Sequence, residues 1–183
     1  MKSPFVNLPI DVRTHLESSG NDLRVSSGTI LLSASNVWDH CYWLQRGAIR
    51  MYYIDIDGRE HNKAFFLMGD FLWPVSEQLR NSPSGFFIEA LTDLDVVSWK
   101  VEFFQKHFDE EEWRRFTLLW VERLLNSKLE RERDWLHLNA TERYKKLFKT
   151  KPDWIENVPD FHLASYLGMT PESLSRIKRQ LTK

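Results

Sequence analysis

Residues 164–181 read ASYLGMTPESLSRIKRQL, and this stretch decides the fold of the chain. Gly168 divides it into two segments with helical apolar spacing, and glycine tolerates the backbone angles that a tight turn requires. Thr170 is a residue type that caps helices, and Pro171 suits the first helical position because its missing N–H is not needed there. The stretch therefore predicts a helix-turn-helix whose second helix covers residues 171–181.

The second predicted helix has an inward apolar face and an outward polar face. Leu174, Ile177 and Leu181 recur at helical spacing and are expected to face inward. The outward residues are Pro171, Glu172, Ser173, Arg176 and Arg179. Arginine binds guanine through two hydrogen bonds, glutamate accepts one from cytosine, and hydroxyl groups bind phosphates. We therefore predict that this face binds double-stranded DNA; a solvated basic face on an ordinary helical hairpin is the alternative.

Formal charge is unevenly distributed along the 183 residues, whose net charge is −1. Residues 1–120 contain 12 Lys and Arg against 17 Asp and Glu, whereas residues 121–183 contain 13 against 9. This division favours two parts with different partners, and it indicates a nucleic acid as the partner of the basic second part.

The composition excludes several classes of protein. Hydrophobic residues make up 42% of the chain and charged residues 28%, as in a globular domain with a core. Cys41 is the single cysteine, which excludes an internal disulfide framework and a site that needs several thiolates, and fits a cytoplasmic location. No apolar run approaches the ~20 residues of a membrane helix. Because no nucleophile, phosphate-loop or zinc motif occurs, we expect neither an enzyme nor a metal site.

Residues 23–101 have the pattern of short strands joined by turns. They are rich in aromatic and β-branched residues, and the regular spacing predicts a β-barrel or sandwich. Asp57-Gly58 lies between two extended segments and predicts a two-residue hairpin turn. Prolines and glycines bracket the segment 69–85, which interrupts the strands and contains a short predicted helix at 75–81. We expect a ligand pocket at this interruption.

Residues 109–138 are predicted to form one long amphipathic helix. Its first residues are acidic and suit the positive end of the helix dipole. An apolar stripe at a spacing of three or four consists of Trp113, Phe116, Trp120 and Leu124. The stripe suits packing on the barrel and pairing with a second copy of the chain; the two are compatible, and we favour a homodimer. Asn139 and Glu142 have the spacing of a capping box that begins the next helix.

This order of barrel, interrupting loop, long helix and helix-turn-helix resembles the Crp/Fnr family of bacterial transcription regulators. LASYLGMTPESLSRIKRQL is similar to the helix-turn-helix of the family, especially its short Bacteroidetes forms, and SSGTILL, WLQRGAIRMYY and MGDF are similar to its β-roll turns. The resemblance implies an α+β fold. It implies a sensor domain at 1–108, an antiparallel β-roll that is like a cyclic-nucleotide-binding domain and of the cupin-like jelly-roll type. A dimerisation helix at 109–138 and a DNA-binding domain at 139–183 are expected to follow.

The resemblance also implies partners and roles. The partners are an inverted-repeat DNA site, a second copy of the chain, RNA polymerase and a small-molecule effector, with no membrane. Glu172 and Arg176 match the residues that bind bases in the family, Arg179 matches a further basic contact, and Thr170 and Ser173 match phosphate contacts. Pro171 stands where arginine is common, so the half-site is expected to differ. A small-molecule sensor whose C-terminal tail contacts protein instead of DNA is the alternative function.

The sensor part departs from the members that bind cyclic AMP. Those members carry a Gly-Glu pair after the GDF turn and an Arg-Ser or Arg-Thr pair after a short helix, where the arginine neutralises the cyclic phosphate. Here the pairs are Trp73-Pro74 and Ser84-Gly85, so a buried phosphate would lack its cation. We therefore predict no tight binding of cyclic AMP and no cofactor; a shifted alignment in which Arg80 takes the role, and a haem held by a histidine, are alternatives. The expected pocket residues are Gly69, Asp70, Phe71, Trp73, Arg80, Ser84 and Gly85.

Overall fold

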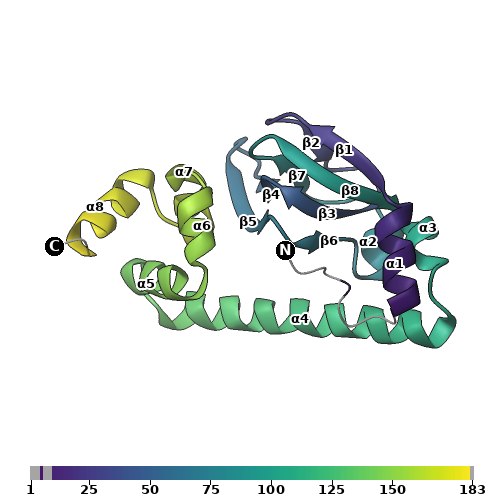
Figure 1. Ribbon diagram of the computed structural model, residues 1–183. Coiled ribbons are helices and arrows are strands. Elements are labelled where there is room, and N and C mark those ends of the chain that lie inside the picture. Colours follow the sequence, from purple (N-terminus) through teal and green to yellow (C-terminus); the bar gives the residue numbers. More distant parts are fainter. Residues whose placement is uncertain (1–4, 6–9, 182–183) are drawn as a thin grey trace.

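The computed structural model describes residue 5 and residues 10–181, and its fold is α+β with a barrel followed by helices (Figure 1). The strands are β1 (Asn21–Val25), β2 (Ile30–Leu32), β3 (His40–Arg46), β4 (Ala48–Ile54), β5 (Glu60–Leu67), β6 (Phe71–Leu72), β7 (Phe87–Ala90) and β8 (Leu94–Lys100). The helices are α1 (Ile10–Ser19), α2 (Glu77–Asn81), α3 (Val101–Gln105), α4 (Glu110–His137), α5 (Ala140–Thr150), α6 (Pro152–Asn157), α7 (Asp160–Leu167) and α8 (Pro171–Leu181). The predicted fold class is confirmed.

The strands form two four-stranded antiparallel sheets. Their strand orders are β1-β8-β3-β6 and β2-β7-β4-β5. On β3, Tyr42 and Leu44 belong to the core between the sheets, whereas Cys41 and Trp43 belong to the cluster on the other face of the first sheet. This follows because successive residues of a strand point to opposite faces. Both faces of β3 are buried, which explains why the middle of its sequence HCYWLQR is apolar instead of alternating.

Aromatic side chains join the outer face of the first sheet to α1, α3 and α4. The buried members of this aromatic cluster are Phe5, Leu16, Cys41, Trp43, Phe71, Trp73, Val75, Val97, Trp99, Val101, Phe104 and Phe116. Many rings meet edge to face, the arrangement that aromatic quadrupoles favour; the centroids of Trp73 and Trp113 lie 5.4 Å apart. Much of the large aromatic content of the chain therefore serves as core.

Helix α4 runs along the barrel and packs one apolar face against it (Figure 1). Phe116 is buried in the aromatic cluster, and Trp113 and Trp120 pack against it partly buried. Packing of the stripe on the barrel is thus confirmed. The dimer interface expected along this stripe stays a prediction, although the barrel of the same chain already buries Phe116 and partly covers Trp113 and Trp120. Leu124, the fourth member, is 40% exposed and borders a cavity.

The other side of α4 carries a second apolar stripe. Leu118 follows Phe116 by two residues, which is about 200° around a helix at ~100° per residue. The exposed apolar residues on this side are Leu118, Val121, Leu125, Leu129 and Leu136. The described part of the single chain leaves this leucine stripe open to solvent, so an apolar partner of α4 must meet it here.

A hairpin joins β4 to β5 as predicted, but its turn is longer than two residues. Residues 55–59 form the connection, in which the N–H of Asp55 donates to the carbonyl of Arg59 at 3.0 Å. The Asp55 carboxylate accepts 2.9 Å hydrogen bonds from the N–H groups of Asp57 and Arg59, and Gly58 adopts φ 78°. The side chain of Asp55 thus organises a wider turn than the two-residue motif predicts.

Candidate nucleic-acid interface

The turn of the helix-turn-helix is built around Gly168. This residue ends α7 with φ 65° and ψ 44°, in the left-handed region that favours glycine. The N–H of Met169 donates to the carbonyl of Ala164 at 3.0 Å and closes the end of the helix. A Cβ atom on Gly168 would lie 2.0 Å from a ring carbon of Trp135 on α4. The backbone angle and the packing therefore both require glycine here, and the predicted turn is confirmed.

Helix α8 begins as predicted. The hydroxyl of Thr170 accepts a hydrogen bond of 3.2 Å from the N–H of Ser173, and Pro171 is the first residue of the helix. Leu174 and Ile177 are buried in a core that also includes residues of α5 and α7. These contacts determine which face of α8 is covered and which face remains outside.

The outward face of α8 is open to solvent. Its exposed residues are Pro171, Glu172, Ser175, Arg176, Arg179, Gln180 and Leu181. The inward orientation predicted for Leu181 is wrong, since this side chain is 45% exposed where α8 reaches the edge of the molecule (Figure 1). Within the described residues, neither Arg176 nor Arg179 forms an ion pair, so both guanidinium groups remain available to a ligand.

Three residues at the start of α8 form a small polar group. The hydroxyl of Thr170 lies 3.2 Å from that of half-buried Ser173 and donates to it. Two hydrogen bonds hold the pKa of the Glu172 carboxyl below its usual range. The larger effect comes from its own backbone N–H, and the smaller from the hydroxyl of Thr170. Glu172 is therefore ionised at neutral pH and acts as a hydrogen-bond acceptor.

Helix α7 docks on the edge of the second sheet. β5 is an outer strand of that sheet, so its outward backbone groups have no neighbouring strand. The hydroxyl of Ser165 accepts a hydrogen bond of 3.0 Å from the N–H of Asn62 and donates one of 3.1 Å to the carbonyl of Glu60. A single side chain of α7 therefore satisfies two backbone groups of the strand edge.

A buried imidazole lies beside this contact. Nδ1 of His162 lies 3.3 Å from a guanidinium nitrogen of Arg50 and 3.3 Å from the amide nitrogen of Asn62. Arg50 also pairs with the carboxylates of Glu60 and Glu89. Burial, followed by the charge of Arg50, lowers the pKa of His162 to about 4. The imidazole is therefore neutral at neutral pH, and Nδ1 accepts hydrogen bonds.

Two arginines join the helix-turn-helix to the rest of the chain. Arg131 of α4 donates to the carbonyl of Lys63 on β5 at 2.8 Å and to that of Tyr166 on α7 at 3.3 Å. Arg143 of α5 donates to the carbonyl of Leu167, the last residue of α7, at 3.1 Å. Because one guanidinium serves several acceptors, each arginine connects segments that are distant in sequence.

The sequence patterns miss this docking contact. Its partners on β5 and α7 lie about a hundred positions apart, as in the pair Asn62 and Ser165, separated by 103. One local signal was present: His162 is a polar residue inside the otherwise largely apolar segment FHLASYL. A histidine on a buried helix face requires a polar partner, although its own sequence does not identify that partner.

The structure places the residues expected to form a sensor pocket in different surroundings. Asp70 and Phe71 line a cavity between the barrel and the C-terminal helices, whereas Trp73 is buried in the aromatic cluster. Arg80 donates to the carbonyl of Pro74 at 3.0 Å and lines a separate hollow beside α3. The other three expected residues, Gly69, Ser84 and Gly85, line neither of these two cavities. The expected sensor pocket therefore stays a prediction.

Among residues 5 and 10–181, no three side chains of His, Cys, Asp or Glu form a group that could hold a metal ion. In the same part of the chain, no helix is long and apolar enough to cross a bilayer.

Comparison with known proteins identifies related folds. No family model and no curated protein matches the sequence. The structure of FixK2 from Bradyrhizobium japonicum matches with a TM-score of 0.73 and 22% identity, over 89% of this chain and 84% of that chain. The c-di-GMP responsive global regulator CLP of Xanthomonas campestris matches with a TM-score of 0.70 and 14% identity, over 95% of this chain and 92% of that chain. A mutant of CooA from Carboxydothermus hydrogenoformans matches with a TM-score of 0.69 and 18% identity, over 100% of this chain and 84% of that chain. The chain therefore has the fold of Crp/Fnr regulators.

Proposed function

We propose that this chain is a transcription regulator of the Crp/Fnr family that binds double-stranded DNA through α8. The observation that carries the proposal is the outward face of this helix, where Glu172, Arg176 and Arg179 are exposed while the opposite face is buried. The shared fold adds support, because CLP, which has the same fold, is a global regulator that links cell-cell signaling to virulence gene expression.

Each exposed residue has a role in this proposal. Glu172 and Arg176 bind base edges in the major groove, since an ionised carboxylate accepts from cytosine and a guanidinium donates to guanine. Arg179 adds a basic contact, and the hydroxyl groups of Thr170 and Ser173 bind phosphate oxygens. Pro171 offers no cation at the position where relatives of the family carry arginine, so the half-site differs from the usual one.

The proposed active form is a homodimer. Residues 1–108 form the sensor domain, 109–138 the dimerisation helix and 139–183 the DNA-binding domain. The exposed leucine stripe of α4 packs against the same stripe of a second copy, which would bury side chains now open to solvent. Two α8 helices related by a two-fold axis and about 34 Å apart match successive turns of DNA, so the site is an inverted repeat. RNA polymerase and a small-molecule effector are the further proposed partners.

We also propose that this regulator does not bind cyclic AMP tightly. The side chain of Arg80 donates to the carbonyl of Pro74 and lies over the rings of Trp73 and Trp113. Its guanidinium is thus already engaged by these three residues. Calorimetric titration of the full chain with cyclic AMP tests this, and sub-micromolar binding would contradict it.

Selection of bound sites from random double-stranded DNA tests the DNA-binding function. The full chain should enrich an inverted repeat, and its affinity should fall steeply with salt because bound Lys and Arg displace counterions from phosphates. The selection is repeated with a metabolite extract of cells to reveal dependence on an effector.

Single substitutions distinguish base contacts from phosphate contacts. Arg176→Ala should lower the affinity for the selected site by about 1–3 kcal/mol and relax its sequence preference at one position. Lys145→Ala, on the exposed side of α5, should weaken binding evenly across sequences. The matched control is Arg24→Ala, because the side chain of Arg24 is exposed on β1, away from α8. If neither Arg176→Ala nor Lys145→Ala differs from this control, the tail contacts protein instead and the alternative function holds.

A further inference from the structure

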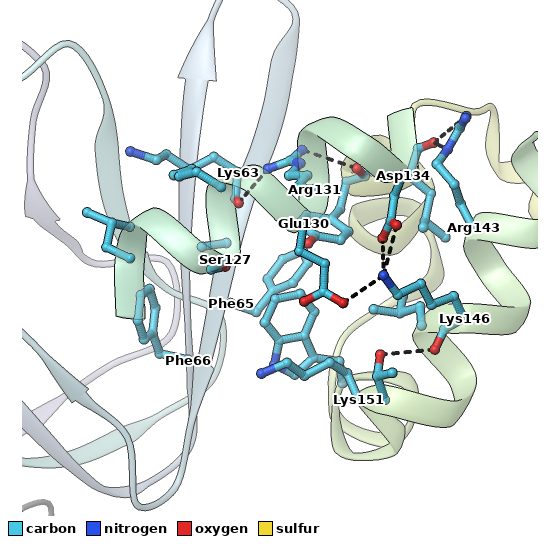
Figure 2. A pocket seen from close by; sticks show the side chains of 18 of the residues that line it. Lys63, Phe65, Phe66, Ser127, Glu130, Arg131, Asp134, Arg143, Lys146 and Lys151 are labelled. Carbon is cyan, nitrogen blue, oxygen red and sulfur yellow. Dashed lines mark hydrogen bonds and ion pairs between the residues drawn. The ribbon is translucent and has the colours of Figure 1, made fainter. Parts of the chain in front are cut away.

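A cavity of ≈ 360 Å³ lies where the barrel, α4 and the C-terminal helices meet. Figure 2 shows that its wall combines side chains from all three parts, including Phe65 of β5, Arg131 of α4 and Lys146 of α5. Its size falls within the ~300–1,000 Å³ range of small-molecule pockets. A ligand in this cavity would contact the barrel and the helix-turn-helix domain at the same time.

The space between the two sheets offers less room. Leu44, Ile49 and Ile88 project into it and are fully buried among other apolar side chains. Close packing of this kind leaves few voids larger than a water molecule. The cavity at the junction offers room for a ligand where the barrel meets the C-terminal helices.

The wall of the junction cavity is basic. Six Lys and Arg side chains line it against three Asp and Glu. Lys146 binds Glu130 at 2.7 Å and Asp134 at 2.6 Å, so two of the three carboxylates already share a cation (Figure 2). The lining lysines that form no ion pair within the described residues are Lys63, Lys128 and Lys151. The cavity therefore has an excess of positive charge in a chain whose net charge is −1.

The cations of this wall disfavour one another. Burial is the main cause that lowers the pKa of Lys63 to about 8, and the charge of Arg131 is the second. The ammonium of Lys63 lies 3.9 Å from the centroid of the Phe86 ring. Loss of solvation by the surrounding protein atoms is the main cause that lowers the pKa of Lys128. The positive charges of Lys63 and Arg131 lower it further. A bound anion would offset this repulsion, since an opposite charge favours the protonated amines.

Flat apolar surfaces line the same cavity. Phe65, Trp154 and Tyr166 form an edge-to-face group, with 5.1 Å between the ring centroids of Phe65 and Trp154 and 5.2 Å between those of Trp154 and Tyr166. Trp120 and Trp135 line the side formed by α4. Aromatic walls of this kind pack against a planar ring.

We propose that the junction cavity binds a small organic anion that carries a flat ring. Lys128 and Lys151 supply the positive charge that attracts the anionic group, and the aromatic side chains cover the ring. Because the wall includes β5, α4 and the C-terminal helices, the bound anion adds contacts that exist only while the helix-turn-helix stays docked on the barrel. By linkage the ligand then favours the docked arrangement. The binding site stands by itself, whereas the effect on DNA rests on the proposed function.

Calorimetry of the full chain without DNA tests the site, with naphthyl phosphate as the probe. We expect naphthyl phosphate to bind at least about tenfold more tightly than either inorganic phosphate or naphthol, because each of these supplies only half of the contacts. Equal affinity for inorganic phosphate would overturn the aromatic part of the proposal, and equal affinity for naphthol the anionic part. No measurable binding of naphthyl phosphate at millimolar concentration would overturn the whole.

Matched lysine variants locate the site. Lys128→Gln and Lys151→Gln should each weaken naphthyl phosphate binding by about tenfold, as expected for the loss of one charge-assisted contact. Lys149→Gln removes the same charge from a lysine that is exposed two residues before Lys151 and does not line the cavity. If all three variants bind equally, the probe binds elsewhere and the proposal fails. Circular dichroism of each variant verifies that it is folded.

A final measurement examines the coupling to DNA. Saturating naphthyl phosphate should change the affinity of the full chain for its selected DNA site by at least about fivefold, a typical coupling between two sites. Lys128→Gln should require about tenfold more naphthyl phosphate for the same change. An unchanged DNA affinity despite calorimetric binding overturns the coupling alone. Absence of any DNA binding overturns the proposed function and leaves the calorimetric result valid.

Discussion

Nδ1 of His162 on α7 lies 3.3 Å from the guanidinium of Arg50 on β4, across a separation of 112 residues. A neutral imidazole accepts this hydrogen bond, and a protonated one would repel the guanidinium. The pair thus connects the helix-turn-helix to the barrel in a way that depends on protonation. Several consequences of this docked arrangement are open to measurement.

The stability of the chain should fall as the pH drops below about 6.5. In the unfolded chain His162 takes up a proton near its ordinary pKa of 6.5, whereas burial and Arg50 lower its pKa to about 4 in the folded chain. Between these values the unfolded state binds more protons, so the free energy of unfolding decreases with falling pH, by up to about 3 kcal/mol. Denaturant titrations from about pH 7 to about pH 4 measure this slope.

A variant separates His162 from the carboxylates that titrate in the same range. His162→Gln keeps an acceptor for Arg50 and Asn62 but has no titrating ring. Its stability should depend less on pH than that of the unmodified chain. Equal slopes for the two proteins would contradict the assignment of the pH dependence to His162.

Ser165→Ala should loosen the contact between α7 and β5. The substitution leaves the N–H of Asn62 and the carbonyl of Glu60 without their partner at the strand edge, at a cost of about 1–2 kcal/mol. Hydrogen exchange at the amide of Asn62 should become faster while exchange within the barrel core stays the same. Ser175→Ala on the exposed face of α8 is the control; a similar effect there would show that the β5 contact is not the cause.

Gly168→Ala should destabilise the protein more than Gly28→Ala, because only at Gly168 would the added Cβ meet another side chain. Gly28 also has a positive φ, of 80°, but a Cβ there meets nothing within 4 Å, so Gly28→Ala costs about 1–2 kcal/mol of backbone strain. At Gly168 the contact with Trp135 adds overpacking, so the total should reach at least about 3 kcal/mol. Equal losses in denaturant titrations would show that Trp135 moves aside without cost.

Leu125→Asp should shift the chain toward a monomer in sedimentation experiments. The substitution places a charge in the middle of the exposed leucine stripe of α4, where a second copy would have to bury it. Ile56→Asp is the control, because Ile56 is fully exposed in the turn between β4 and β5. The homodimer is contradicted along this face if both variants sediment like the unmodified chain.

Local sequence patterns predicted those parts of the fold whose physical causes lie within a few residues. Gly168 identified the turn, Thr170 and Pro171 the start of α8, and Asn139 with Glu142 the capping box that begins α5. The longer turn at 55–59 escaped prediction, because it depends on how the Asp55 side chain bonds to later backbone groups.

The stripe on α4 shows the limit of periodicity. The spacing of Trp113, Phe116 and Trp120 reveals an apolar face, but it does not reveal whether a barrel or a second helix covers that face. The structure places the barrel there and leaves Leu118 and Leu125 on the other side for a partner. Trp73 and Arg80 show the same limit, since their sequence does not reveal that Trp73 joins the aromatic cluster and that Arg80 lies over its ring.

By itself, the sequence determined the element order, the helix-turn-helix and the chemistry of the outward face of α8, because capping, turns and helical spacing act over a few residues. Only the tertiary structure decided that α7 docks on the edge of β5, that His162 is neutral beside Arg50, and that a basic cavity lies at the junction. These features bring together side chains about a hundred positions apart. Such contacts arise from packing of whole elements, and no local pattern carries them.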